Sequence, residues 1–293
     1  MSNKNKPVPK IICEVGCNHK GSIDTAKEMI KIAAEFCNVN IVKFQKRCVK
    51  ESLSNEEYNS PHPVPQNSYG DTYGAHREYL EFSIDQHKEL KKHCEKFGVE
   101  YSSSVWDLTS AKEIAALSPK LIKIPSAINT KRNVIEYLLK NFEGEIHISL
   151  GMTTKKEEKE IVNLIKQYKR GKSVILYHCI SAYPIDAELL YLREIERLIK
   201  YKSFINDIGF SGHHKGISSD IVALTLGANY FERHFTLDRT WKGTDHAASL
   251  EPDGMRKLSR DLSHVHKALT YKPKEILDVE QVQRDKLKWT PKN

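Results

Sequence analysis

The chain has 293 residues, of which 39% are hydrophobic, and its 46 Lys and Arg against 38 Asp and Glu give a formal net charge of +8. No apolar run approaches the roughly 18 residues of a membrane span, and the N-terminus lacks the apolar segment of a secretory signal. A positive charge suits either nucleic acid or a small anionic substrate. Because the lysines are interleaved with Glu along helical patterns, we expect a small anion and no nucleic-acid or membrane partner.

Six cysteines, at positions 13, 17, 37, 48, 94 and 179, are spread along the chain without a C-x-x-C pair. In a chain of this length the pattern favours free thiols over a disulfide framework or a cysteine zinc cluster. We therefore expect a cytoplasmic protein.

Short apolar segments alternate with helical patterns along the chain. Parallel strands need a crossover between them, so this alternation predicts a parallel sheet, and eight units would close a (β/α)₈ TIM barrel. An open doubly wound sheet is the alternative, but residues 16–21 do not form its preferred G-x-G-x-x-G turn. In chain order, we expect strands at 10–15, 41–45, 99–105, 121–126, 145–150, 173–179, 207–212 and 230–236, and helices at 23–36, 84–97, 108–117, 131–141, 154–170, 187–200, 217–226 and 253–269.

Two segments fall outside this alternation. Residues 48–82 contain several Pro and Gly residues and are predicted to form a long βα loop, a length typical of a functional lid or of disorder. Residues 272–293 are charged and are predicted to be a tail that packs under the barrel or leads towards a further domain. We therefore expect a synthase barrel over 1–271 and a C-terminal tail over 272–293.

Polar side chains at the ends of the predicted strands indicate where the chemistry occurs, because barrel enzymes place their catalytic groups at the carboxyl ends of strands. Lys43 and Lys123 lie inside apolar strands, where alternation points them inward; the alternative is a surface lysine. Two cations ringed by hydroxyls predict a phosphate or carboxylate site. The other polar residues near these ends are Glu14, Gln45, Ser103, Ser104, Ser126, Ser149, His178, Ser181, Ser211, His213, Glu232 and His234.

His213 and His234 follow adjacent predicted strands, so they can share one metal ion. Imidazoles without a thiolate suit Mn²⁺, Fe²⁺, Co²⁺ or Zn²⁺, whereas Mg²⁺ prefers oxygen ligands. Two protein ligands would leave positions open for water and substrate, as a catalytic ion requires.

Several of these residues also have a structural interpretation. The serines can cap the following helices, and His178 can be a hydrogen-bonded core residue. Glu14 would need a partner such as a lysine or a substrate hydroxyl, and Glu232 can be a salt-bridge acid. We expect solvated side chains on polar helices for His87, His93, His264 and His266.

Nine segments, in their order and spacing, resemble the sialic acid synthase family, which comprises N-acetylneuraminate synthases and their legionaminate and pseudaminate relatives. They are ICEVGCNHKG at 12–21, VKFQ at 42–45, SVWD at 104–107, IKIPS at 122–126, SLGM at 149–152, HCISAYP at 178–184, GFSGH at 209–213, ERHFTLD at 232–238 and GTDHAASLEP at 243–252.

The resemblance implies condensation of phosphoenolpyruvate with an open-chain 2-acetamido sugar, N-acetylmannosamine or a 6-deoxy diacetamido sugar, to a nine-carbon 2-keto acid and phosphate. His213 and His234 would hold a divalent ion that polarises the sugar aldehyde, with Mn²⁺ expected and Mg²⁺ or Co²⁺ as alternatives. Glu14 matches the family acid near the reacting carbons. Phosphoenolpyruvate would be bound by Lys43, Lys123, Ser104, Ser126, Ser149, Ser181 and Ser211, and the sugar or its ordered water by Gln45, Tyr183 and Asp245.

The sequence departs from the family pattern in three ways. Ile128 stands where the family has an acid, and Ser181 stands where better-known members have asparagine. We also expect no C-terminal antifreeze-like domain, whose arginine binds the N-acetyl group in a partner's site. The resemblance therefore implies a homodimer with a possible separate cap subunit. The alternatives are a synthase that acts on a phosphorylated sugar and a non-catalytic barrel subunit.

Overall fold

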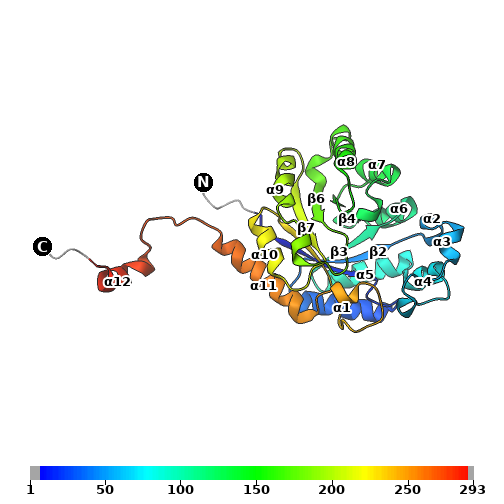
Figure 1. Ribbon diagram of the computed structural model, residues 1–293, viewed down its shortest axis with the longest axis horizontal. Coiled ribbons are helices and arrows are strands. Elements are labelled where there is room, and N and C mark those ends of the chain that lie inside the picture. The colour runs from blue at the N-terminus through cyan, green and yellow to red at the C-terminus, as the bar shows by residue number, and fades with distance from the viewer. Residues whose placement is uncertain (1–6, 290–293) are drawn as a thin grey trace.

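The computed structural model describes residues 7–289 and contains a closed barrel of parallel strands that follow one another in chain order (Figure 1). Each strand pairs with the next, and β8 closes the barrel by pairing with β1. The predicted (β/α)₈ barrel is confirmed, and the open sheet is wrong. The strands are β1 (Lys10–Gly16), β2 (Ile41–Lys46), β3 (Glu100–Val105), β4 (Leu121–Ile124), β5 (Glu145–Ser149), β6 (Val174–Cys179), β7 (Asp207–Gly212) and β8 (Tyr230–His234).

Helices surround the barrel, and several begin at the side-chain caps that the sequence offers. Ser22, Ser83 and Thr154 each accept a hydrogen bond from a backbone N–H in the first turn of the helix that follows. No helix within residues 7–289 is long and apolar enough to span a membrane. The outer helices are α1 (Ile23–Glu35), α5 (Ile84–Lys96), α6 (Leu108–Ala116), α7 (Arg132–Asn141), α8 (Lys155–Gln167), α9 (Glu194–Leu198), α10 (Ser218–Thr225) and α11 (Pro252–Ala268).

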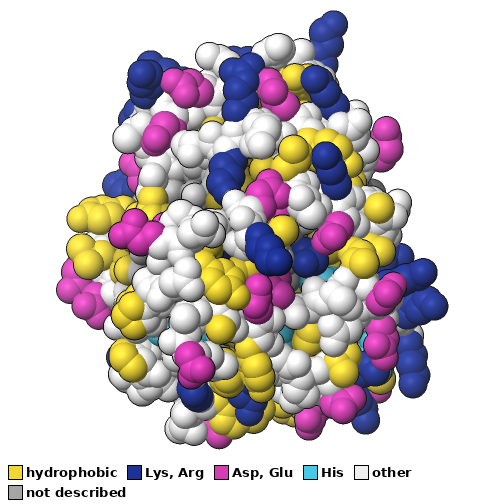
Figure 2. Space-filling model, turned by 90° about the vertical axis from the view of Figure 1, so that its right-hand side faces the viewer, with side chains coloured by type: hydrophobic (Ala, Val, Ile, Leu, Met, Phe, Trp, Pro, Cys, Tyr) yellow, Lys and Arg dark blue, Asp and Glu magenta, His cyan; other side chains and the backbone are white. Residues whose placement is uncertain are grey.

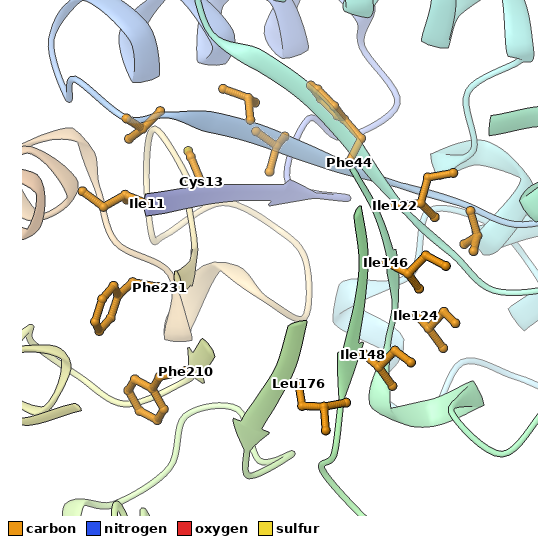
Figure 3. Close-up of a cluster of buried hydrophobic side chains, with 14 of the residues drawn as sticks. Ile11, Cys13, Phe44, Ile122, Ile124, Ile146, Ile148, Leu176, Phe210 and Phe231 are labelled. Atoms are coloured by element: carbon orange, nitrogen blue, oxygen red, sulfur yellow. The ribbon is translucent and has the colours of Figure 1, made fainter. Parts of the chain in front are cut away.

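Alternation along the strands divides the buried side chains into two layers. Apolar side chains such as Ile11, Phe44 and Ile122 belong to the main hydrophobic core, which also includes the inner faces of the helices (Figure 3). The intervening residues belong to the barrel interior, where Ile12 and Ile175 are part of a separate small cluster. The same alternation therefore directs Lys43, Lys123 and Glu232 inwards.

Two predicted segments differ from the structure. The helix expected at 187–200 is broken into η5 (Ala187–Leu189), α9 and η6 (Ile199–Ser203), and Tyr191 between them has a φ of 44°, outside the helical region. The segment 48–82 contains short helices, namely α2 (Val49–Ser52), α3 (Asn55–Asn59), η2 (Pro65–Asn67) and α4 (Tyr73–Leu80). The segment predicted as a long loop is therefore partly helical, and Ser54 and Thr72 cap the first turns of α3 and α4.

The C-terminal segment leaves the barrel after α11 and carries α12 (Asp278–Leu287), which Figure 1 shows well away from the barrel. None of residues 272–289 is buried, and Val279 and Leu287 are 80% and 77% exposed. Packing of this part of the tail under the barrel is therefore not observed.

His87 is buried, which corrects the expectation that it is solvated. It lies on the inner face of α5 with Leu90 and Cys94, and its Nδ1 is 2.7 Å from the hydroxyl of Tyr101 on β3. The polar composition of α5 concealed this face, because a histidine contributes a polar atom that a buried tyrosine can satisfy.

Candidate active site

The predicted site residues lie around one cavity of about 280 Å³ at the carboxyl ends of the strands. Figure 2 faces this end of the barrel, where basic, acidic and histidine side chains meet near the middle. The structure thereby brings together residues that are up to 231 positions apart. They are Glu14, Lys43, Gln45, Ser104, Lys123, Ser126, Ser149, Ser181, Tyr183, Ser211, His213, His234 and Asp245.

Lys43 lies at the bottom of the cavity and is 1% exposed. Its Nζ donates a hydrogen bond to Ser104 Oγ at 2.7 Å and forms an ion pair with Glu14. Glu232 Oε1 is 3.6 Å from the same nitrogen. A buried ammonium group needs such partners, and these two acids supply them.

Lys123 faces Lys43 from β4 and is 3% exposed. Its Nζ is 2.6 Å from Glu232 Oε1 and 4.5 Å from the centroid of the Tyr177 ring. Burial lowers the pKa of Lys123, and Glu232 opposes that shift. The two lysines and Glu232 therefore form one charge network on the floor of the cavity.

The two acids of this network have opposite pKa shifts. Burial raises the pKa of Glu14, although Lys43 opposes the shift. Burial also acts to raise the pKa of Glu232, but Lys123 and Lys43 outweigh it and the pKa is lowered. Glu232 is thus the permanent counter-ion, whereas Glu14 can carry a proton near neutral pH. The sequence left open whether Glu232 is a structural acid or a site residue. Because residues two apart on a strand point to the same side, its position two residues before His234 indicates that it faces the site.

The serine hydroxyls lie close together because a glycine lies between them. A Cβ on Gly151 would lie 2.5 Å from Ser181 Oγ and 2.7 Å from Ser126 Oγ, so no larger residue fits without displacing a hydroxyl. The Gly151 N–H donates to Ser126 Oγ at 3.0 Å. The hydroxyl oxygens of Ser149 and Ser181 are buried and have no partner among the described residues. These hydroxyls can therefore bind a ligand in the cavity.

The rings of His213 and His234 lie side by side with centroids 5.4 Å apart. His213 Nδ1 lies 2.9 Å from the Ile180 carbonyl oxygen, which can only accept, so Nδ1 donates and Nε2 carries the lone pair in the neutral ring. Burial acts to lower the pKa of His213, but the adjacent Cys179 outweighs it and the pKa is raised. His234 Nδ1 is buried without a hydrogen-bond partner in residues 7–289, and Asp245 Oδ2 lies 3.9 Å from it. Burial lowers the pKa of His234, which favours the neutral ring that a metal requires.

These donors fit an ion held by two imidazoles. An unpartnered buried ring nitrogen on His234 and a tautomer of His213 fixed by a backbone carbonyl are features of metal ligands. Within residues 7–289, no three His, Cys, Asp or Glu side chains converge on one point, so a structural four-ligand site is not formed. Any ion here would keep positions for water or substrate.

Ser103, whose buried hydroxyl donates to the Ser104 carbonyl at 3.2 Å, lies outside the cavity that contains the other predicted residues, and so does His178. Its Nε2 lies 2.8 Å from the Leu190 carbonyl oxygen, and its ring stacks on Phe210 on the outer side of the barrel. The core interpretation of His178 is therefore confirmed. Three further cations that line the cavity were not predicted: Arg47 directly follows β2, Arg77 lies in α4, and Lys242 lies in the segment after β8.

A parallel (β/α)₈ barrel with buried lysines, unpartnered hydroxyls and paired imidazoles around a cavity at its carboxyl end is the architecture of a barrel enzyme. The chain belongs to the NeuB family, whose model matches residues 29–274. This confirms the family that the sequence segments resemble.

Named relatives agree with this assignment. The chain is 35% identical over 279 residues to human N-acetylneuraminate-9-phosphate synthase, and the aligned region covers 94% of this chain and 76% of the relative. It is 32% identical over 260 residues to N,N'-diacetyllegionaminic acid synthase of Campylobacter jejuni, with coverages of 88% and 77%. The crystal structure of N-acetylneuraminic acid (sialic acid) synthetase from Leptospira borgpetersenii aligns with a TM-score of 0.79 at 26% identity, over 98% of this chain and 96% of that one.

Proposed function

We propose that this protein condenses phosphoenolpyruvate with the aldehyde of an open-chain 2-acetamido sugar and forms a nine-carbon 2-keto acid and phosphate. One observation carries the proposal: Lys43 and Lys123 are buried on the floor of the cavity that the paired rings of His213 and His234 also line. An anion site beside paired imidazoles suits a phosphorylated enol that meets a polarised aldehyde. The names of the relatives support the same reaction.

The lysines and hydroxyls would bind phosphoenolpyruvate. Charge-assisted hydrogen bonds from Lys43 and Lys123 are strong where water is excluded, and the unpartnered hydroxyls of Ser149 and Ser181 supply further donors. Glu232 would hold both lysines in place through its ion pairs. Ser104, Ser126 and Ser211 complete this part of the cavity.

The acceptor would lie towards the mouth, where Gln45, Tyr183 and Asp245 line the cavity. His213 and His234 would hold a divalent ion, with Mn²⁺ expected from the nitrogen donors and Co²⁺ or Mg²⁺ as alternatives. When bound, that ion supplies Lewis-acid stabilisation of the negative charge on the aldehyde oxygen. Tyr183, whose ring centroid is 4.1 Å from that of His213, would position the sugar against it.

In the reaction, C3 of phosphoenolpyruvate attacks the aldehyde carbon, and the cation that develops at C2 takes up water. The tetrahedral carbon then collapses to the ketone, and phosphate leaves by cleavage of the C–O bond at C2. Of the two protons that the water loses, one converts the former aldehyde oxygen to a hydroxyl and the other leaves with phosphate. Glu14 accepts a hydrogen bond from Gln45 Nε2 at 3.0 Å and has a raised pKa, so it can accept a proton that this water loses. Glu14 and Lys43 are paired, which would place the base beside the bound enol.

We also propose a cytoplasmic location, since all the cysteines are free thiols, three of them buried in the main hydrophobic core. A homodimer, with or without a separate cap subunit, follows from the family resemblance. Cross-linking and sedimentation of the purified protein would test the dimer.

The test is turnover of phosphoenolpyruvate with N-acetylmannosamine, with its 6-phosphate and with a 6-deoxy diacetamido sugar, each with and without Mn²⁺. We expect equal amounts of phosphate and of 2-keto acid with at least one acceptor, and loss of both after metal chelation. Tight binding of phosphoenolpyruvate without turnover of any acceptor would instead indicate a non-catalytic barrel subunit. The relatives' names include both a phosphorylated and an unphosphorylated product, so they leave the acceptor class open.

A further inference from the structure

Arg233 lies between Glu232 and His234 on β8 and is fully buried, and the proposed reaction does not use it. Alternation points its side chain to the opposite side of the strand from Glu232 and His234, which line the cavity. Its register partner on β7 is Gly212, the residue before His213. The Arg233 side chain therefore lies on the outer side of the barrel wall, behind the two histidines.

The guanidinium group of Arg233 binds the loop that joins β7 to α10. Nη1 donates to the Gly216 carbonyl at 2.8 Å, and Nη2 donates to the His214 carbonyl. Nη1 also lies 3.1 Å from Nε2 of the His214 ring. These contacts hold the residues that directly follow His213, so a side chain of β8 fixes the loop that carries the histidine of β7.

Asp220, in the first turn of α10, holds the guanidinium group in place. Its Oδ2 is 2.6 Å from Nη1 of Arg233 and 3.2 Å from Nε2 of His214, and both charged side chains are 0% exposed. A buried ion pair contributes little to stability, because the attraction roughly offsets the cost of removing two charges from water. The pair is therefore better explained by the geometry it fixes than by the stability it adds.

His214 adds a second constraint on the same loop. A Cβ on Gly212 would lie 2.9 Å from Nδ1 and Cε1 of the His214 ring, so the ring lies directly on the backbone of β7. On the cavity side, His213 Nδ1 donates to the Ile180 carbonyl at 2.9 Å. The position of the His213 ring is thus set by its own hydrogen bond and, through the loop, by Arg233.

We propose that Arg233 and Asp220 are positioning residues for the metal site: the guanidinium group, held by Asp220, fixes the loop after β7 against β8 and so sets the separation of the His213 and His234 rings. This inference rests on the proposed function, in which these rings hold a divalent ion. Neither positioning residue would touch the ion or a substrate. Residues that orient metal ligands in this way typically change metal affinity about 10- to 100-fold.

The test is the Kd for Mn²⁺, measured without substrate from the electron paramagnetic resonance signal of the free ion. The main variant combines Arg233→Met with Asp220→Leu, which removes both charges and leaves neither buried alone, so we expect it to fold. Its Kd for Mn²⁺ should rise at least about tenfold. Its Kd for phosphoenolpyruvate, measured by calorimetry without metal, should not change, because Lys43 and Lys123 take their partners from within the cavity.

Arg233→Lys is a second variant, and it carries the test if the paired substitution does not fold. It keeps a positive charge beside Asp220, but a lysine has one donor nitrogen in place of the planar fork and cannot bind both loop carbonyls in the same way. We therefore expect a raised Kd for Mn²⁺ here too. Wild-type affinity in Arg233→Lys would overturn the role of the fork.

The matched control combines Arg197→Met with Glu158→Leu. These residues form an ion pair at 2.7 Å that joins α8 to α9, and neither lines the cavity. The control removes the same two charges from another ion pair. The Kd for Mn²⁺ should stay at the wild-type value even if the melting temperature falls.

The outcomes separate this inference from the proposed function. A wild-type Kd for Mn²⁺ in the main variant, or an equal rise in the control, would overturn the positioning role and leave the condensation intact. Normal Mn²⁺ binding without turnover of any 2-acetamido sugar would overturn the condensation and leave the positioning role intact. Absence of Mn²⁺ binding to the wild-type protein would overturn the metal site, and the positioning role with it.

Discussion

Single residues in the barrel interior are charged because each has a counter-charge within reach. Lys43, Lys123, Glu14 and Glu232 are all less than 5% exposed, and their side chains form one network. Removal of one member would leave an opposite charge buried without its partner, which typically costs about 3–5 kcal/mol. The same network organises the anion site, so stability and binding are coupled here.

Replacement of Lys123 tests this coupling. In Lys123→Met, Glu232 keeps Lys43, at 3.6 Å, as its lysine partner and the Ser211 hydroxyl, at 3.3 Å, as a donor, so we expect the free energy of unfolding to fall by about 3 kcal/mol. The KM for phosphoenolpyruvate should rise at least about tenfold, because a charge-assisted contact is lost. Urea unfolding and steady-state kinetics measure the two effects.

Lys120→Met is the matched control, because Lys120 is 75% exposed and forms a surface ion pair with Glu100. Its unfolding free energy should change by less than about 1 kcal/mol. Equal effects of the two substitutions would show that the inner network has no special role.

At the scale of elements, polar residues within helices decide how the helices attach to the barrel. α5 buries His87, Leu90 and Cys94 on one face. On this face, His87 Nδ1 lies 2.7 Å from the hydroxyl of Tyr101 on β3. Burial lowers the pKa of His87 to about 3. A neutral histidine is therefore part of the interface, and protonation would weaken it.

The stability of the protein should consequently depend on pH through His87. The unfolded chain binds this proton below about pH 6.5, whereas the folded chain resists it down to about pH 3, so stability is present above pH 6.5 and is lost as pH falls through this window. The slope contributed by one such group reaches about 1.4 kcal/mol per pH unit. Urea unfolding at several pH values measures it.

His87→Leu should flatten this dependence between about pH 6 and pH 4 relative to the wild-type protein. The control is His264→Leu, on the exposed face of α11, which should give a curve parallel to that of the wild-type protein. Parallel curves for both variants would contradict a role for His87.

At the scale of the whole molecule, the barrel is closed and carries its own core, and residues 272–289 add no buried side chain to it. The main core includes residues from β1 to α11, and no residue of 272–289 is buried. The free energy of folding should therefore reside in the barrel.

Truncation after Tyr271 tests this division. We expect the melting temperature of the shortened protein to stay within about 2 °C of the full chain, because no buried area is lost. A fall of about 5 °C or more would mean that the tail packs on the barrel in solution, either in its own chain or in a second copy.

Much of this protein was determined by the sequence alone. Period-two alternation within strands and their spacing by helices predict the barrel, and Lys43 and Lys123 inside apolar strands predict an inward-facing cation pair. Strand ends converge in a closed barrel, so the sequence also predicts that His213, after β7, lies close to His234, in β8, as the structure shows.

The tertiary structure decided what local pattern cannot encode. The burial of His87 and the outward direction of His178 depend on partners, Tyr101 and the Leu190 carbonyl, whose proximity only folding creates. Arg77 and Lys242 line the same cavity from two connecting segments, 165 positions apart in sequence, and no periodicity predicts where such segments lie in space. Periodic patterns determine elements and the faces they bury, whereas contacts between loops depend on the closed barrel that holds them.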